Sequence, residues 1–159
     1  MTTTAAKILS AGAARFELEV SIEAPIDDVW QAVIQQPDAW WVSDMRCVSA
    51  GSTMHLEPRA GGTLVESDDA GASLLWFTVL AVEPGRSINF EGALAPPFGG
   101  PCSTYLLLEL ETRASLTVVK LTHSLHGHVD EAMLPEMESG WRLLFEGGLK
   151  PFVETGTSA

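Results

Sequence analysis

The residues best suited to chemistry in this chain are three histidines in its last third, His123, His126 and His128. Successive side chains of a strand point to opposite faces, so His126 and His128 share one face and His123 points to the other. An imidazole that faces inward can orient a ligand oxygen or transfer a proton. The alternative for His123 is a buried histidine that a nearby backbone or hydroxyl group satisfies.

A metal site would need more ligands than these histidines supply. The nearest carboxylates in the sequence are Asp130 and Glu131. A closed tetrahedral site would also need Cys47, His55 or Cys102 from distant segments. We therefore expect neither a metal nor a cofactor.

Catalytic motifs are not evident. No nucleophile elbow, phosphate-binding loop or pair of catalytic carboxylates stands out, and Gly61-Gly62 lacks the rest of a nucleotide fingerprint. Glu66 is a candidate base if its strand turns it inward, although such a residue is more often on a solvated face. Catalysis is therefore not assigned, and His123 is the candidate acid or base for an enzymatic alternative.

The element that must position these groups is a long amphipathic helix expected from Asp130 to Glu154. Its apolar residues recur at helical spacing and form one stripe, which also contains Gly148. The stripe consists of Leu134, Met137, Trp141, Leu144, Phe145 and Phe152. Asp130 is expected to cap a first turn, Pro135 to begin the main helix, and Pro151 to bend it.

The two faces of this helix have different roles. On the wet face, Glu138–Arg142 and Glu146–Lys150 have the spacing of ion pairs. On the buried face, Gly148 leaves a gap between bulky side chains. This gap means either close packing against the sheet or room for a ligand.

The rest of the chain has mostly strand patterns. Residues 15–22 alternate apolar and polar, and two short helices are expected at 26–34 and around Trp40 and Trp41. Six strands follow between Arg46 and Leu125. Residues 46–50, at the start of this region, also have a strand-like pattern. A bulky amphipathic helix needs a wide apolar partner, so the sequence predicts one α+β domain over 15–155. Residues 1–14 are expected to be a flexible tail.

Composition excludes several classes of partner. The 159 residues carry a formal net charge of −12, which argues against nucleic acid and against anionic membrane surfaces. No apolar run approaches a membrane span. Without a secretion signal, Cys47 and Cys102 are expected to be free thiols and the protein cytoplasmic, with a disulfide between them as the alternative.

Several stretches together resemble a known superfamily. They are Ser21 to Trp30, Trp40-Trp41, Gly61-Gly62, Val79 to Ile88, Val119 to Ser124, and Gly140-Trp141. Their order, from about Phe16 to Glu154, resembles START-like domains, also called SRPBCC or birch-pollen-allergen-like domains. It is most similar to the branch named after the activator of heat-shock protein 90 ATPase. The resemblance implies a helix-grip fold, in which a curved antiparallel sheet of about seven strands wraps a long C-terminal helix. It also implies two short helices after the first strand and a cavity between sheet and helix.

Strand parity and the helix stripe predict which side chains line such a cavity. Lys120, Glu109 and Glu111 should face water, so His123 and Leu108 should face inward. The candidate ligand-binding residues are Trp41, Trp76, Phe90, Phe98, Leu108, His123, Met137, Trp141, Phe145 and Gly148. Each could instead be a core residue, but the set as a whole suits a small hydrophobic molecule.

Two parts of the cavity wall are open to interpretation. Along residues 73–82, the set Leu74, Trp76 and Leu80 competes with the set Leu75, Phe77 and Val79 for the inner face. The loop Ala93 to Pro101 is apolar, with Phe98 at its middle, so it is expected either to cap the core or to form a lid.

Three functions are compatible with this pattern. The first is a module that binds or carries a small hydrophobic ligand. The second is an enzyme like the cyclases or hydratases of the superfamily, with His123 as acid or base. The third is a chaperone-associated protein, for which a chaperone or a second copy of the chain would be the partner. Fold alone does not decide among them.

Overall fold

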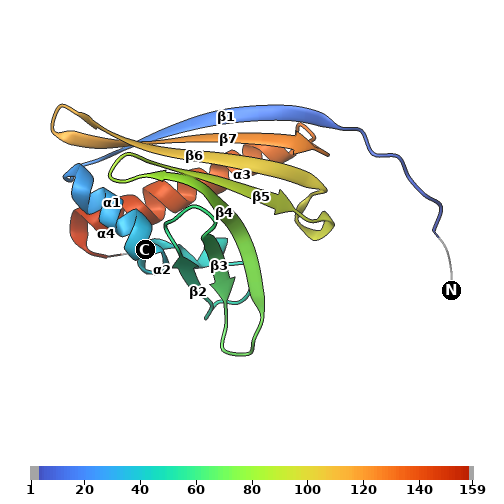
Figure 1. Ribbon diagram of the computed structural model, residues 1–159, viewed down its shortest axis with the longest axis horizontal. Helices are drawn as coiled ribbons and strands as arrows, with labels where there is room; N and C mark the ends of the chain where they lie inside the picture. The colour runs from blue at the N-terminus through green and yellow to red at the C-terminus, as the bar shows by residue number, and fades with distance from the viewer. Residues whose placement is uncertain (1–3, 158–159) are drawn as a thin grey trace.

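The computed structural model describes residues 4–157, in which seven antiparallel strands form one curved sheet around a C-terminal helix (Figure 1). The order of the strands is β1-β7-β6-β5-β4-β3-β2. The first strand therefore pairs with the last one, from Gly12 opposite Gly127 to Ile22 opposite Thr117. This arrangement confirms the predicted helix-grip fold.

Strands β2 to β7 follow one another along the described part of the chain with no α-helix between them, as the sequence patterns indicate. In chain order they are β1 (Gly12–Ile22), α1 (Ile26–Gln35), α2 (Pro37–Trp40), η1 (Ser43–Met45), β2 (Thr53–Leu56), β3 (Thr63–Ser67), β4 (Ser73–Glu83), β5 (Ser87–Leu94), η2 (Pro96–Phe98), β6 (Cys102–Arg113), β7 (Leu116–Gly127), α3 (Met133–Arg142), η3 (Leu143–Leu149) and α4 (Lys150–Thr155). The sheet arches over α3, while α1 and α2 lie at one end of it (Figure 1).

Strand parity is regular across the centre of the sheet. The pairing of β6 with β7 runs from Cys102 opposite Gly127 to Arg113 opposite Leu116 in an unbroken register. Leu106 and Leu108 of β6 are buried, and so is His123 of β7. The alternation thus aims His123 at the inner face, as the sequence predicts.

In strand β4, residues of both competing sets face inward, because the strand contains two bulges. Its register with β3 shifts so that Trp76 is an extra residue, and its register with β5 shifts at Leu80. An extra residue reverses which side chains face inward. Trp76 and Phe77 therefore both belong to the inner face, whereas Leu80 is exposed.

The C-terminal helix is continuous but changes its winding. The α-helix α3 passes into a π-helical segment, η3, before α4 begins at Lys150. Pro151 cannot donate to the carbonyl of Gly147 and would clash with it, which disfavours ordinary α-helical bonding there. Asp130 Oδ1 accepts the backbone N–H groups of Ala132 and Met133 at 2.9 and 3.0 Å and caps the first turn.

The wider winding also changes the predicted ion pairs. Glu138 pairs with Arg142 as expected, with 3.2 Å between their charged atoms. Glu146 instead pairs with Arg142 at 3.3 Å, and Lys150 pairs with Glu154 at 3.0 Å. The predicted Glu146–Lys150 pair is wrong, because Glu146 lies inside the π-helical segment and Lys150 directly after it, so their spacing is no longer that of an α-helix.

Two further expectations need correction. The first strand begins at Gly12, three residues before the expected boundary of the tail, because Gly12 to Ala14 pair with the end of β7. Residues 46–50 form no strand; their backbone turns inward, and the N–H groups of Cys47 and Val48 donate to Glu66. Within residues 4–157, every helix is too short or too polar to cross a bilayer.

Candidate functional site: two cavities under the sheet

Two adjacent cavities lie between the sheet and the helices. The inner cavity has a volume of about 30 Å³ and the outer one about 220 Å³. Trp141 of α3 and Phe77 of β4 line both of them, and their ring centroids lie 6.1 Å apart. These two rings therefore form the partition between the cavities.

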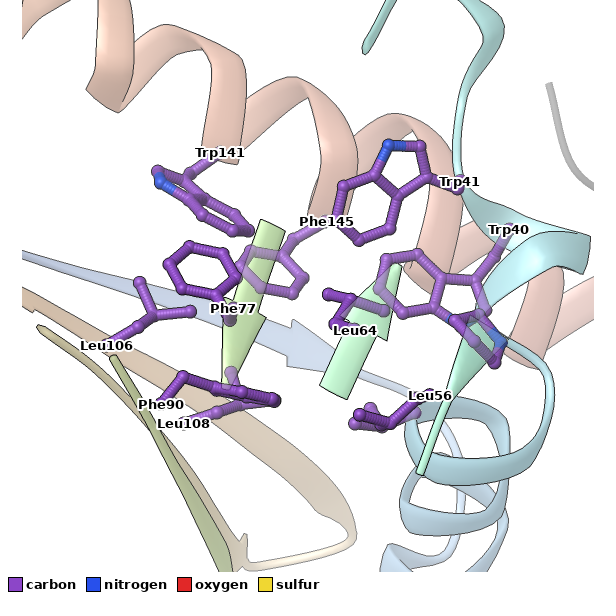
Figure 2. A pocket seen from close by; sticks show the side chains of 12 residues that line it. Trp40, Trp41, Leu56, Leu64, Phe77, Phe90, Leu106, Leu108, Trp141 and Phe145 are labelled. Atoms are coloured by element: carbon purple, nitrogen blue, oxygen red, sulfur yellow. The ribbon is translucent and has the colours of Figure 1, made fainter. Parts of the chain in front are cut away.

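The inner cavity belongs to the packed core. Figure 2 shows Trp141 and Phe145 pointing from the C-terminal helix toward Phe77 on the sheet side. Besides Trp141, which lines both cavities, four predicted site residues line this one and are buried: Trp41, Phe90, Leu108 and Phe145. Its volume is far below that of the engineered cavity of roughly 150 Å³ that accepts benzene, and its walls are apolar. In this conformation these four residues act as core packing.

The outer cavity is large enough for a small molecule. The predicted site residues that line it are Trp76, Phe98, His123, Met137 and Trp141. They come from β4, η2, β7 and α3, so the cavity lies between the curved sheet and the first half of the helix. The loop residue Phe98 is 46% exposed and lies at its edge, where the sequence places a lid or a cap.

Gly148 lies outside both cavities, which corrects its predicted place in the ligand site. A Cβ atom on Gly148 would lie 2.1 Å from the carbonyl oxygen of Trp40 and 3.2 Å from Val42 Cγ1. The missing side chain thus allows the helix to approach α2 closely. The glycine that does line the outer cavity is Gly140, where a Cβ would meet only the mobile end of Met45, at 3.2 Å.

His123 is the central polar group of the outer cavity. It is 3% exposed, its Nδ1 accepts the indole N–H of Trp141 at 3.1 Å, and its ring packs edge-on against Phe16 at 5.1 Å. Its Nε2 is buried without a hydrogen-bond partner. Burial lowers the pKa of His123 to about 4, so the ring is neutral at physiological pH.

The Glu66 side chain is buried, and its carboxylate accepts hydrogen bonds only from groups of the protein itself. Its carboxylate accepts the backbone N–H groups of Cys47 and Val48, at 3.0 and 2.8 Å. It also accepts the Ser52 hydroxyl at 2.5 Å and the Trp76 indole at 3.0 Å. Burial raises the pKa of Glu66, but these four hydrogen bonds outweigh it and leave the pKa below its ordinary value. The carboxylate therefore holds the cavity wall together and has no lone pair left to act as a base.

The two cysteines are unpaired, as expected. Cys47 lines the outer cavity, but burial and the charge of Glu66 raise the pKa of its thiol, so it is a poor nucleophile. Within residues 4–157, no three histidine, cysteine or carboxylate side chains converge in a way that would hold a metal ion.

Sequence reasoning missed several residues of the outer cavity. Thr104 is 3% exposed and shares the inner face of β6 with Leu108, so the parity that predicted Leu108 could have found it. Glu136 lies one residue before Met137 on α3, at the edge of the predicted stripe. Met45 and Cys47 come from η1 and the loop after it, for which the sequence has no regular pattern.

The comparison with protein families is decisive for the classification. The family described as activator of Hsp90 ATPase homolog 1-like protein matches residues 23–154. The chain belongs to this family. The matched region contains His123, Trp141 and every other residue of the outer cavity described above. A search of curated proteins gave no match.

Solved structures show that this fold is widespread. A protein from Rhizobium leguminosarum is 20% identical, with a TM-score of 0.71 over 93% of this chain and 99% of that one. The Aha1 dimer from Colwellia psychrerythraea is 21% identical, with a TM-score of 0.60 over 90% and 98%. Ara h 8.0201 is 12% identical, with a TM-score of 0.68 over 89% and 98%. At these identities the likeness establishes the fold alone.

Proposed function

We propose that this protein binds a small hydrophobic molecule in the outer cavity. The observation that carries the proposal is the size and lining of that cavity, about 220 Å³ lined mainly by aromatic and aliphatic side chains. An engineered apolar cavity of roughly 150 Å³ is known to accept benzene. A cavity of this volume therefore suits a molecule somewhat larger than a single aromatic ring.

The few polar groups of the cavity suit orientation of a ligand. His123 and Thr104 are buried and lie on the same face of neighbouring strands, because Leu106 is opposite His123 and Thr104 is two residues before Leu106. Glu136 lies on α3, which faces them from the other side of the cavity. A largely apolar pocket with a few placed hydrogen-bonding groups is the usual form of a small-molecule site.

The same geometry weighs against His123 as a general acid or base. The lone pair of Nδ1 is already used to accept the Trp141 indole. With a pKa of about 4, His123 is almost entirely neutral at neutral pH, so the imidazolium that would act as the general acid is scarce. Glu66, the other candidate, is saturated by four donors. A binding or carrier function therefore has better support than a cyclase- or hydratase-like one.

Protein partners remain predictions. The family description names the Hsp90 ATPase, and the Colwellia psychrerythraea relative is a dimer, which supports self-association or a chaperone partner for this chain as well. Sedimentation of the purified protein, alone and with an Hsp90, would test both. If this protein sediments as a monomer in both samples, these partners are excluded at the concentrations used.

Ligand binding is tested with an environment-sensitive hydrophobic dye and two matched glycine variants. The dye should bind the native protein at one site and quench tryptophan emission, because tryptophans line the cavity. Gly140→Leu should weaken binding strongly by filling the outer cavity. Gly147→Leu is the control, since Gly147 lies outside both cavities and a Cβ there would meet only Leu143, at 3.3 Å. Equal binding by the two variants, or binding only after heat unfolding, would contradict the proposal.

A further inference from the structure

The outer cavity contains a polar atom that the protein leaves unsatisfied. Among the buried side-chain nitrogen and oxygen atoms of residues 4–157, His123 Nε2 alone has no hydrogen-bond partner. Buried polar atoms without partners are rare, because losing water without a replacement is costly. The His123 side chain lines the outer cavity, so a molecule there that reaches Nε2 would supply the missing partner.

Trp141 determines which kind of partner this is. An indole N–H can only donate, so His123 Nδ1, 3.1 Å away, must accept. A neutral imidazole has one donor and one acceptor nitrogen, and its proton is therefore on Nε2. Trp141 cannot easily turn away, because its ring is stacked on Phe145 at 5.8 Å and packed against Phe77 and Trp41. The packing thus keeps Nε2 as a hydrogen-bond donor.

The charges around the cavity disfavour an anionic ligand. Glu136 is the charged residue among those lining the cavity, and no lysine or arginine accompanies it there. The formal charge of the whole chain is −12. Glu136 is exposed at the rim, and an anion entering the apolar interior of the cavity would lose water with no cation to compensate, so a neutral molecule is favoured.

We propose that the His123–Trp141 pair makes the outer cavity selective for neutral, planar hydrophobic molecules that carry a carbonyl or ether oxygen, which accepts a hydrogen bond from His123 Nε2. This inference rests on the proposed function and names the class of ligand. The volume of about 220 Å³ accommodates a compact bicyclic skeleton, and the Thr104 hydroxyl is a second hydrogen-bonding group on the same face.

Naphthalenes with different substituents at one ring carbon test the proposal. Acetylnaphthalene has the acceptor oxygen, isopropenylnaphthalene has the same shape without it, and naphthoate is the anion. Calorimetry should show that the acetyl compound binds roughly threefold to tenfold tighter than the isopropenyl compound, the range for one neutral hydrogen bond. Naphthoate should bind most weakly. His123→Leu should abolish the preference for the acetyl compound while retaining the isopropenyl compound.

A second variant tests the part played by Trp141. Trp141→Phe removes the donor at Nδ1 and allows the proton to move there, so that Nε2 can accept. The affinity for naphthol, a donor, should then rise relative to that for acetylnaphthalene. Trp40→Phe is the control, because Trp40 also buries an indole N–H but gives it to the carbonyl of Ala32. It should leave the naphthol-to-acetylnaphthalene ratio unchanged.

The outcomes separate this inference from the function on which it rests. Failure of both neutral naphthalenes to bind would overturn the proposed function. Equal binding of the acetyl and isopropenyl compounds would overturn the selectivity and leave the function standing. Nitrogen NMR of the wild-type protein at neutral pH provides a check that needs no variant. It should find His123 protonated at Nε2, and a proton on Nδ1 would overturn the inference.

Discussion

The indole N–H of Trp76 donates to the carboxylate of Glu66 at 3.0 Å, which ties the bulge of β4 to the inner face of β3. The same carboxylate holds the loop after η1 through the backbone N–H groups of Cys47 and Val48. One buried side chain therefore fixes two walls of the outer cavity, to which Trp76 and Cys47 both belong.

Glu66→Gln is expected to destabilise the protein markedly. The amide NH₂ would replace an oxygen that now accepts two donors, so two N–H or O–H groups would lose their acceptor and face another donor. Hydrogen bonds to buried charged groups are worth about 1.5–3 kcal/mol, so the free energy of unfolding should fall by about 3 kcal/mol in urea titrations. Glu57→Gln is the control, because Glu57 forms an exposed pair with Arg59. Equal effects of the two changes would show that the Glu66 network contributes little.

Stability should decrease as the pH falls below the ordinary pKa of histidine. The folded protein holds the pKa of His123 at about 4, below its ordinary value of 6.5, so between these values the unfolded chain binds more protons. The contribution is complete above pH 6.5 and is lost as the pH falls toward 4. Between pH 7 and 5 this loss should amount to about 2 kcal/mol.

The His123→Leu variant isolates this effect. Glu136 and Cys47 are the other titratable residues that line the same cavity, and the variant retains both. Unfolding titrations should give it a flatter profile than the wild type over the same pH range. Parallel profiles would mean that His123 is not a source of the pH dependence.

Two glycines of the C-terminal helix should respond differently to alanine. Gly148→Ala would place Cβ 2.1 Å from the Trp40 carbonyl oxygen, and this backbone contact cannot easily relax. Overpacking of this kind costs about 3 kcal/mol of unfolding free energy. Gly140→Ala meets only the end of Met45, and the better helix propensity of alanine offsets about 1 kcal/mol. If thermal unfolding shows Gly140→Ala to be less stable than Gly148→Ala, the close approach of the helix to α2 is contradicted.

Phe98 is expected to slow the escape of a bound ligand. It lines the outer cavity from η2 yet is 46% exposed, so its loss should affect folding little. Phe98→Ala should raise the dissociation rate of acetylnaphthalene severalfold in stopped-flow measurements. Tyr105→Ala is the control, because Tyr105 is similarly exposed at 48% and lies outside both cavities.

Hydrogen exchange supplies a second test of this loop. Exchange of the amides between Ala93 and Phe98 should slow when acetylnaphthalene is added, because a closed loop opens less often. Unchanged exchange at saturating ligand, together with an unchanged dissociation rate in Phe98→Ala, would exclude a lid.

The inward direction of His123 could be predicted because β6 and β7 pair without a shift, so two-residue periodicity holds along their whole length. In β4 the same reasoning could not decide, since the bulges at Trp76 and Leu80 reverse parity twice and bulges leave little trace in a single sequence. Parity thus predicts a strand reliably only where its register is unbroken.

Glu66 and Gly148 show what local pattern cannot contain. The donors to Glu66 come from an irregular loop 14 to 19 residues earlier in the chain and from Trp76 across a bulge. The group that requires a glycine at 148 is the carbonyl of Trp40, which belongs to a different helix. Helical spacing places Gly148 on the buried stripe but says nothing of what lies opposite, so the tertiary contact decides between packing and space.

The most direct test of ligand binding is a crystal structure of the protein grown with saturating acetylnaphthalene. We expect the naphthalene ring to lie in the outer cavity, between Trp76 and Met137, with the carbonyl oxygen of the ligand within hydrogen-bond distance of His123 Nε2. An empty outer cavity, with the compound instead on the exposed side chains Leu80 and Tyr105, would contradict it.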